Sequence, residues 1–79
     1  MSTNSDAITE FISKEFLNGA SRPDEDTNLI ESDIIDSLGI FTLVSFIEGH
    51  FDIKVEPDEV TIENFESVDA VTRLVESKL

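Results

Sequence analysis

The sequence predicts an all-α domain with three principal helices, one short helix and a long loop after the first helix. Two observations carry this prediction. Apolar residues recur at helical spacing in three segments, and only one segment alternates like a strand. In addition, a chain of 79 residues without cysteine has no disulfides and depends on well-packed helices for its core. We therefore expect residues 1–79 to form a single domain.

The first helix is predicted from about Asp6 to Leu17. Its apolar residues follow a helical period: Ile8, Phe11, Ile12, Phe16 and Leu17. Either Ser5 or Asp6 can cap its start, and Asn18-Gly19 is a typical helix stop.

A long loop is predicted between this helix and the next. Pro23 disfavours helix at the preceding residue, and polar turn-forming residues dominate as far as Asn28. The loop is expected to be pinned to the core by Leu29, Ile30, Ile34 and Ile35. Loops of this length in compact domains are usually functional.

The segment from Ser37 to Phe51 predicts an amphipathic helix. Its core stripe comprises Ile40, Leu43, Val44, Ile47 and Phe51. Outside that stripe are Leu38, Phe41, Thr42, Ser45 and Gly49. Because Leu38 and Phe41 are large and apolar, this second face indicates either a partner surface or a wide, buried stripe.

The C-terminal third predicts a connector and two helical segments. Residues 51–57 alternate like a strand, but a lone strand is unstable, so an extended connector is expected. Residues 57–65 predict one or two helical turns. A last helix should begin at Glu66 or Ser67 and bury one face, formed by Val68, Val71, Leu74, Val75 and Leu79.

The formal net charge of −13 argues against nucleic acids and anionic membranes as partners. Nucleic acids and anionic membranes are bound through Lys and Arg, of which there are only five. The chain has no apolar run long enough to span a membrane and no signal-peptide pattern at its start, so a cytoplasmic protein is expected. The charge favours partners with basic patches, or simply keeps a small protein monomeric.

No catalytic or metal centre is apparent. Asp24, Asp26 and Asn28 resemble the start of a calcium loop, but the required Gly and Glu are absent from their positions. The single histidine, His50, lies thirteen residues after Ser37 on the same predicted helix, about 20 Å away along its axis. A Ser-His pair is therefore excluded if the helix is continuous, and we expect a non-catalytic protein.

Two interpretations of Ser37 remain. Asp36 or Ser37 can cap the second helix, which is the common role of such residues. Alternatively, Ser37 is a modification site, because a helix N-terminus favours an attached phosphoester. The two are compatible if Asp36 caps while Ser37 is modified.

The motifs of the chain closely resemble the acyl carrier protein family, including its peptidyl and aminoacyl carrier relatives. The resemblance covers nearly the whole chain and is carried by Asp36-Ser37-Leu38, Phe51-Asp52-Ile53, Pro57-Asp58 and Asn64-Phe65. It implies a four-helix bundle with a short third helix and a long loop between helices 1 and 2.

The resemblance also implies a cofactor and a set of partners. Ser37 would carry 4'-phosphopantetheine, transferred from coenzyme A by a phosphopantetheinyl transferase, and Asp36 would help hold Mg²⁺ during that transfer. The arm would carry acyl or aminoacyl thioesters between an activating ligase and downstream synthases, transferases or condensing enzymes. Leu38 would contact these enzymes, together with the matching positions Phe41, Thr42, Ser45, Glu48 and Gly49.

One departure from the family narrows the expected role. Fatty-acid-type members have several acids along the second helix, whereas Thr42 and Gly49 replace two of them here and Glu48 stands alone. This favours a carrier in a specialised pathway, or one for aminoacyl groups, and docking that is more apolar and less sensitive to salt. The alternative hypothesis is an acidic helical adaptor that is never modified.

Overall fold

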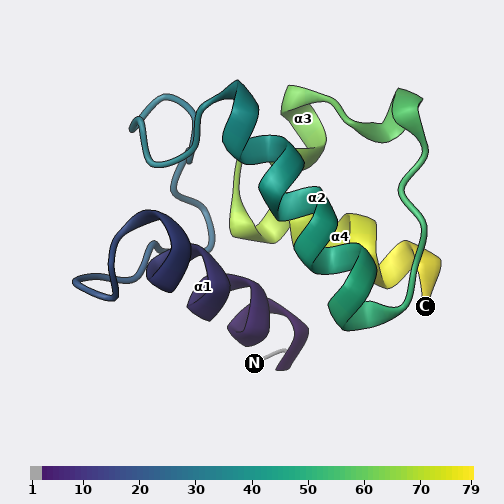
Figure 1. The fold of residues 1–79 in the computed structure, drawn as a ribbon, viewed down its shortest axis with the longest axis horizontal. Helices are drawn as coiled ribbons and strands as arrows, with labels where there is room; N and C mark the ends of the chain where they lie inside the picture. The colour runs from purple at the N-terminus through teal and green to yellow at the C-terminus, as the bar shows by residue number, and fades with distance from the viewer. Residues whose placement is uncertain (1–2) are drawn as a thin grey trace.

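The computed structural model describes residues 3–79, and within them the chain is all-helical, as predicted. Its elements are α1 (Thr3–Phe16), α2 (Ser37–Phe51), the 3-10 turn η1 (Pro57–Glu59), α3 (Ile62–Phe65) and α4 (Val68–Lys78). In Figure 1, α2 crosses in front of α4, α1 lies below them, and α3 is at the top of the bundle. Over this range no segment forms a strand, so the connector prediction for residues 51–57 is confirmed.

α1 begins at Thr3, three residues earlier than predicted. Ser5 is buried inside the first turn and Asp6 follows it in the helix, so neither caps the start. Within this added turn, the Asn4 side chain donates a hydrogen bond of 3.2 Å to a Glu76 carboxylate oxygen on α4. The predicted stop is confirmed: Asn18 and Gly19 both have positive φ, which ends the helix.

The core combines residues from every helix and from both connecting segments. Buried apolar side chains are Ile8, Ile12, Leu29, Ile35, Ile40, Leu43, Ile47, Val55, Phe65, Val68, Val71, Leu74 and Val75. Val44 and Phe51 are half-buried and pack against the edge of this core. One core prediction needs correction, because Leu79 follows the end of α4 and is exposed.

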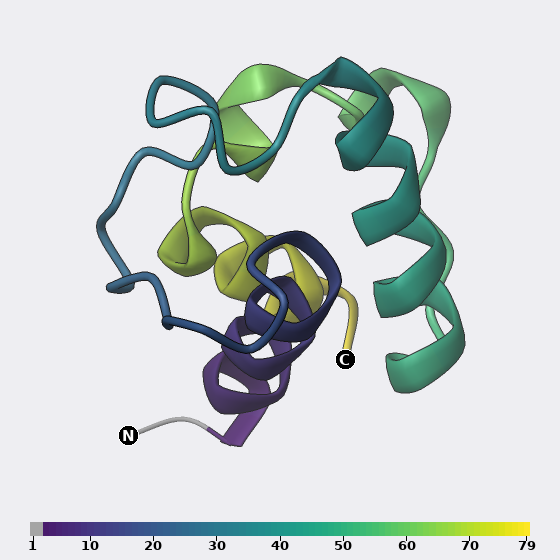
Figure 2. The same ribbon diagram turned by 60° about the vertical axis from the view of Figure 1, so that its left-hand side comes forward.

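The long loop is anchored by the main chain of Leu29, whose side chain is fully buried. The Leu29 N–H donates to the Glu66 carbonyl at 2.6 Å, which ties the loop to the segment between α3 and α4. The Leu29 carbonyl accepts from the N–H groups of Ile34 and Ile35, both at 3.0 Å. The loop is visible on the outer side of the molecule in Figure 2, where it leads from α1 to the start of α2.

The turn after Leu29 is stabilised locally by Asn28. The Asn28 side-chain oxygen accepts from the N–H groups of Ile30 and Glu31, at 3.0 and 2.9 Å. The Ser32 hydroxyl donates to the Asn28 carbonyl at 2.6 Å. The chain immediately before α2 is therefore a hydrogen-bonded turn whose position is set by the core.

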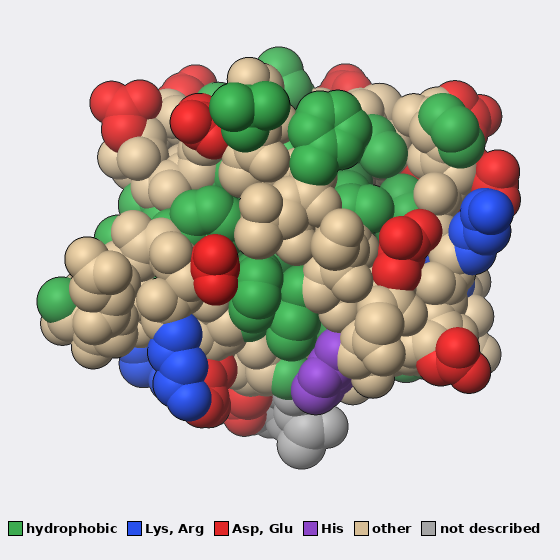
Figure 3. Space-filling view, viewed as in Figure 1, with side chains coloured by type: hydrophobic (Ala, Val, Ile, Leu, Met, Phe, Trp, Pro, Cys, Tyr) green, Lys and Arg blue, Asp and Glu red, His purple; other side chains and the backbone are tan. Residues whose placement is uncertain are grey.

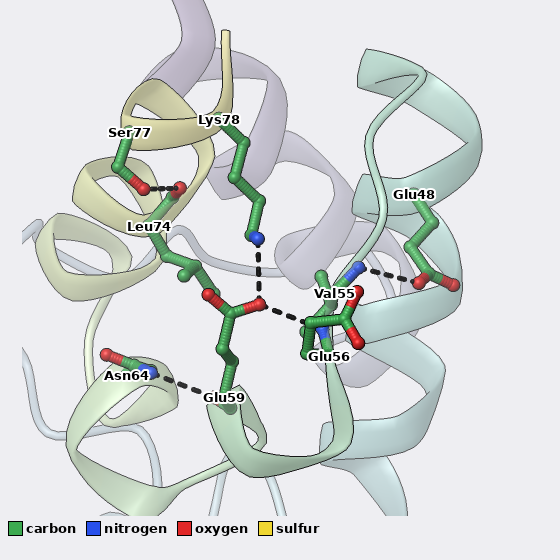
Figure 4. Close-up of polar contacts among 8 residues, drawn as sticks. All are labelled: Glu48, Val55, Glu56, Glu59, Asn64, Leu74, Ser77 and Lys78. Atoms are coloured by element: carbon green, nitrogen blue, oxygen red, sulfur yellow. Dashed lines mark hydrogen bonds and ion pairs between the residues drawn. The ribbon is translucent and has the colours of Figure 1, made fainter.

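The connector between α2 and α3 is held by two carboxylates (Figure 4). A Glu48 oxygen accepts from the Val55 N–H at 2.9 Å. A Glu59 oxygen accepts from the Glu56 N–H at 2.8 Å and lies 2.7 Å from Lys78 Nζ on α4. The Lys78 ammonium and then the Glu56 N–H hold the pKa of Glu59 below its ordinary value. These contacts fix the entry to α3 against the end of α4.

A comparison of two phenylalanines tests the corrected core. Phe65 is fully buried, whereas Phe51 is half-buried. Phe65→Ala is expected to lower the free energy of unfolding by about 3–5 kcal/mol, and Phe51→Ala by clearly less. Urea denaturation of both variants measures this difference, and equal losses would contradict the assignment of Phe51 to the edge.

The Glu59 contact predicts a pH dependence. Because the pKa of Glu59 is lowered in the folded state, its stabilisation is present above the unfolded value of about 4.5 and is lost as the pH falls through the folded value. Glu59→Gln should therefore be less stable than the parent at pH 7, and the gap should close below pH 4 or so. Glu15→Gln, which removes an exposed charge, corrects for general charge relief. A gap that does not change with pH would contradict this role.

Candidate functional site

The start of α2 is defined by a side-chain cap from Asp36. The Gly39 N–H donates to Asp36 Oδ1 at 2.7 Å, and the Ile40 N–H donates to the Asp36 carbonyl at 3.1 Å. Asp36 has extended backbone geometry, as N-cap residues do. Of the two caps that the sequence allowed, the structure selects Asp36.

Ser37 is the first residue of α2 and its side chain is exposed. Among residues 3–79, its hydroxyl has no hydrogen-bond partner, and the N–H groups of Ser37 and Leu38 are not used by the cap. These two N–H groups, at the positive end of the helix dipole, create a favourable environment for an anion attached to Ser37. The nearest basic residues in the sequence are Arg22 and Lys54, so this environment comes from the main chain.

Gly39 allows the start of α2 to approach the end of α1. A Cβ atom at Gly39 would lie 2.9 Å from Phe16 Cε1 and 3.0 Å from the buried Ile35 Cγ2. Any larger residue would therefore push the first turn of α2 away from the core. The position of Ser37 depends on this absence of a side chain two residues later.

The residues predicted to face partners lie along the solvent side of α2. Leu38 and Phe41 are 74% and 61% exposed, which is high for large apolar side chains. The structure therefore rejects the wide buried stripe. Thr42, Ser45 and Gly49 are exposed as well. Figure 3 shows hydrophobic side chains gathered on the face of the molecule over this part of α2.

Glu48 differs from the other members of this set. Its side chain is half-buried and one carboxylate oxygen accepts the Val55 N–H. The only acid of α2 is thus engaged within the fold, and its contact with partners stays a prediction.

Ile62 is a candidate site residue that sequence reasoning missed. It is 60% exposed at the start of α3, whose Thr61 N-cap accepts the Asn64 N–H. Figures 1 and 2 both show α3 beside the first turns of α2. Helical periodicity could not find it, because Phe65, three residues later, is fully buried and would be assigned the same face.

His50 lies too far along α2 to form a hydrogen bond with Ser37. Because α2 is continuous, His50 stays thirteen residues away, about 20 Å along the axis. Its ring stacks on Phe46, with ring centroids 5.0 Å apart. The described residues also contain no group of three or more His, Cys, Asp or Glu side chains that could hold a metal ion, and no helix long and apolar enough to cross a membrane.

Comparison with known proteins identifies the class. The chain is similar to D-alanyl carrier proteins from two strains of Lactococcus lactis subsp. cremoris and one of subsp. lactis. Each is 33% identical over 57 residues, which cover 72% of this chain and 72% of the relative. No protein-family model matches. With this identity and coverage, and with its four-helix fold, the chain belongs to the carrier protein family.

The two glycines of α2 give a matched test of the site geometry. Gly49→Ala should raise the free energy of unfolding by up to about 1 kcal/mol, because nothing lies within 4 Å of its added Cβ and Ala favours helix. Gly39→Ala should lower it instead, by about 1–3 kcal/mol, because the added carbon overpacks Phe16 and Ile35. Thermal denaturation compares them, and a stabilised Gly39→Ala protein would contradict the close approach.

Proposed function

We propose that residues 1–79 form one cytoplasmic carrier domain that is loaded with 4'-phosphopantetheine on Ser37. The observation that supports this most directly is the exposed hydroxyl of Ser37 at the start of a capped helix. Membership of the carrier protein family supports the carrier role itself. The protein acts as a substrate and shuttle for other enzymes and performs no catalysis of its own.

The loading step is a phosphoryl transfer. Ser37 Oγ attacks the phosphorus of coenzyme A that bears the pantetheine, and the bond from this phosphorus to the bridging oxygen of the pyrophosphate breaks. The products are a serine phosphodiester and adenosine 3',5'-bisphosphate, and the hydroxyl proton leaves to a base of the transferase. Mg²⁺ is needed only during this transfer, and Asp36, directly before Ser37, is the residue proposed to help hold it.

The residues around Ser37 fit this group. The free N–H groups of Ser37 and Leu38 can face the phosphate, while the Asp36 side chain is already directed to Gly39 as a cap. When attached, the arm supplies a terminal thiol that carries an acyl or aminoacyl group as a thioester. The chain itself has no cysteine, so its own residues offer no competing thiol.

Partner enzymes are proposed to dock on the solvent face of α2. A phosphopantetheinyl transferase, an activating ligase and a downstream synthase, transferase or condensing enzyme must each reach Ser37. Leu38 and Phe41 offer an exposed apolar contact beside it, and Ile62 extends this surface onto α3. Thr42, Ser45 and Gly49 continue it along α2.

The similarity to D-alanyl carrier proteins supports an aminoacyl cargo for this chain. The sequence of α2 agrees with this choice, because it has Thr42 and Gly49 where fatty-acid-type carriers have acids. A carrier of aminoacyl groups in a specialised pathway is therefore our preferred assignment within the family.

Loading of Ser37 is tested with the intact protein. Incubation with coenzyme A, Mg²⁺ and a broad-range phosphopantetheinyl transferase should add the mass of one phosphopantetheine, which intact mass spectrometry detects. Ser37→Ala should gain nothing, whereas Ser21→Ala, which removes an exposed serine of the long loop outside the docking face, should still be loaded.

The same variants separate a loaded carrier from an unmodified adaptor. A parent protein that gains no mass, or a Ser37→Ala protein that still gains it, would overturn the proposal. In the native host, an adaptor would keep its function in the Ser37→Ala variant and lose it on substitution of Leu38 or Phe41. A loaded carrier loses its function in all three.

A further inference from the structure

A depression of about 330 Å³ opens beside the start of α2. It is lined by Phe16, Asp33, Ile34, Asp36, Leu38, Gly39 and Thr42. The lining includes both sequence neighbours of Ser37, so the backbone of Ser37 lies next to the depression. Its volume lies at the lower end of the range of small-molecule pockets. The lining contains no residue of α3.

The walls of this depression combine apolar and hydrogen-bonding groups. Phe16 and Ile34 are half-buried and pack against the core, and the exposed Leu38 closes one side. The Asp33 carboxylate and the Thr42 hydroxyl, both exposed, add acceptors at the edge. The depression is therefore suited to a flexible chain with apolar groups and N–H or O–H donors.

The position of the depression is fixed by contacts already described. Ile35 is held by its N–H bond to the Leu29 carbonyl, and Asp36 by its cap on Gly39. Gly39 forms part of the floor, and its missing side chain lets Phe16 approach α2. The depression is thus formed before any ligand arrives, which lowers the entropic cost of ordering one.

The surroundings of Ser37 contain groups that repel an anion and groups that attract one. The carboxylates of Asp33 and Asp36 repel a phosphate, whereas the N–H groups at the helix start attract one. The phosphate of a Ser37 phosphodiester is therefore directed to the main-chain N–H groups. The uncharged part of a pantetheine arm begins with a dimethyl-bearing carbon and a hydroxyl, followed by two amides, and these groups match the depression. Its N–H and O–H groups can donate to carboxylates.

The other large hollow near α2 is too far from Ser37 to receive the beginning of the arm. It lies between α1 and α2 and is lined by Phe11, Phe46 and His50, among others. Phe46 and His50 are nine and thirteen residues beyond Ser37, about 14 and 20 Å along the helix axis.

We propose that Phe16, Ile34 and Thr42 form a docking groove for the uncharged part of the pantetheine arm, on the side of α2 that faces the long loop. This inference rests on the proposed loading of Ser37. It assigns to the loop and to the end of α1 the role of a resting place for the arm between encounters with enzymes.

Nuclear magnetic resonance of the loaded parent protein tests the groove. Protons of the arm's dimethyl group should show nuclear Overhauser contacts to the side chains of Phe16 and Ile34. The amide signals of Phe16 and Thr42, which are distant in sequence from Ser37, should shift between the unloaded and loaded forms. Mass spectrometry of the same sample establishes that the arm is attached.

Two variants sharpen the test. Thr42→Phe fills the groove and should abolish the Overhauser contacts to Phe16, whereas Lys54→Phe, which adds the same ring at an exposed position of the connector after α2, should retain them. Contacts to Ile62 instead, or no contacts in a loaded parent protein, would overturn the groove and leave the carrier function standing. A parent protein that gains no mass would overturn both.

Discussion

The hydrogen bonds of Leu29 are the constraint on which the rest of the site depends. One residue in the middle of the long loop is fully buried, donates to the segment between α3 and α4, and accepts from the two residues just before Asp36. Without this anchor, a loop of twenty residues would leave the start of α2 loosely placed. With this anchor, segments that are distant in sequence hold the Asp36 cap, Ser37 and the neighbouring groove in fixed positions.

Features determined by neighbouring residues could be predicted from the sequence, and features determined by distant ones could not. The caps at Asp36 and Ser67 follow from side chains that bond to N–H groups three residues later. The contact between Asn4 in the first turn of α1 and Glu76 on α4 joins residues far apart in sequence, and no local pattern reveals it. The exposure of Ile62 likewise follows from how a four-residue helix is oriented by the bundle.

The candidate site also combines features set by neighbouring residues with features set by distant ones. The residues around Ser37 allowed either a cap or a modification site, and the family resemblance implied an attachment point. The structure adds an exposed hydroxyl, N–H groups that the cap does not use and a depression next to the start of α2, all of which are compatible with the proposed attachment. The depression could not be anticipated, because its walls come from the end of α1, the loop and α2. The requirement for Gly39 is also visible only once Phe16 and Ile35 are seen beside it.

Because the Glu48 carboxylate is already bonded to the Val55 N–H, the first encounter with a partner enzyme and the final alignment on it depend on different residues. The chain carries a net charge of −13, yet the proposed docking face of α2 presents no ionised side chain that is not already used within the fold. Attraction toward a basic partner then comes from acids elsewhere on the surface, which speeds the first encounter but specifies little about orientation. The final alignment is left to the fit of Leu38 and Phe41, so the lifetime of a complex and the rate of its formation can be tuned by separate sets of residues.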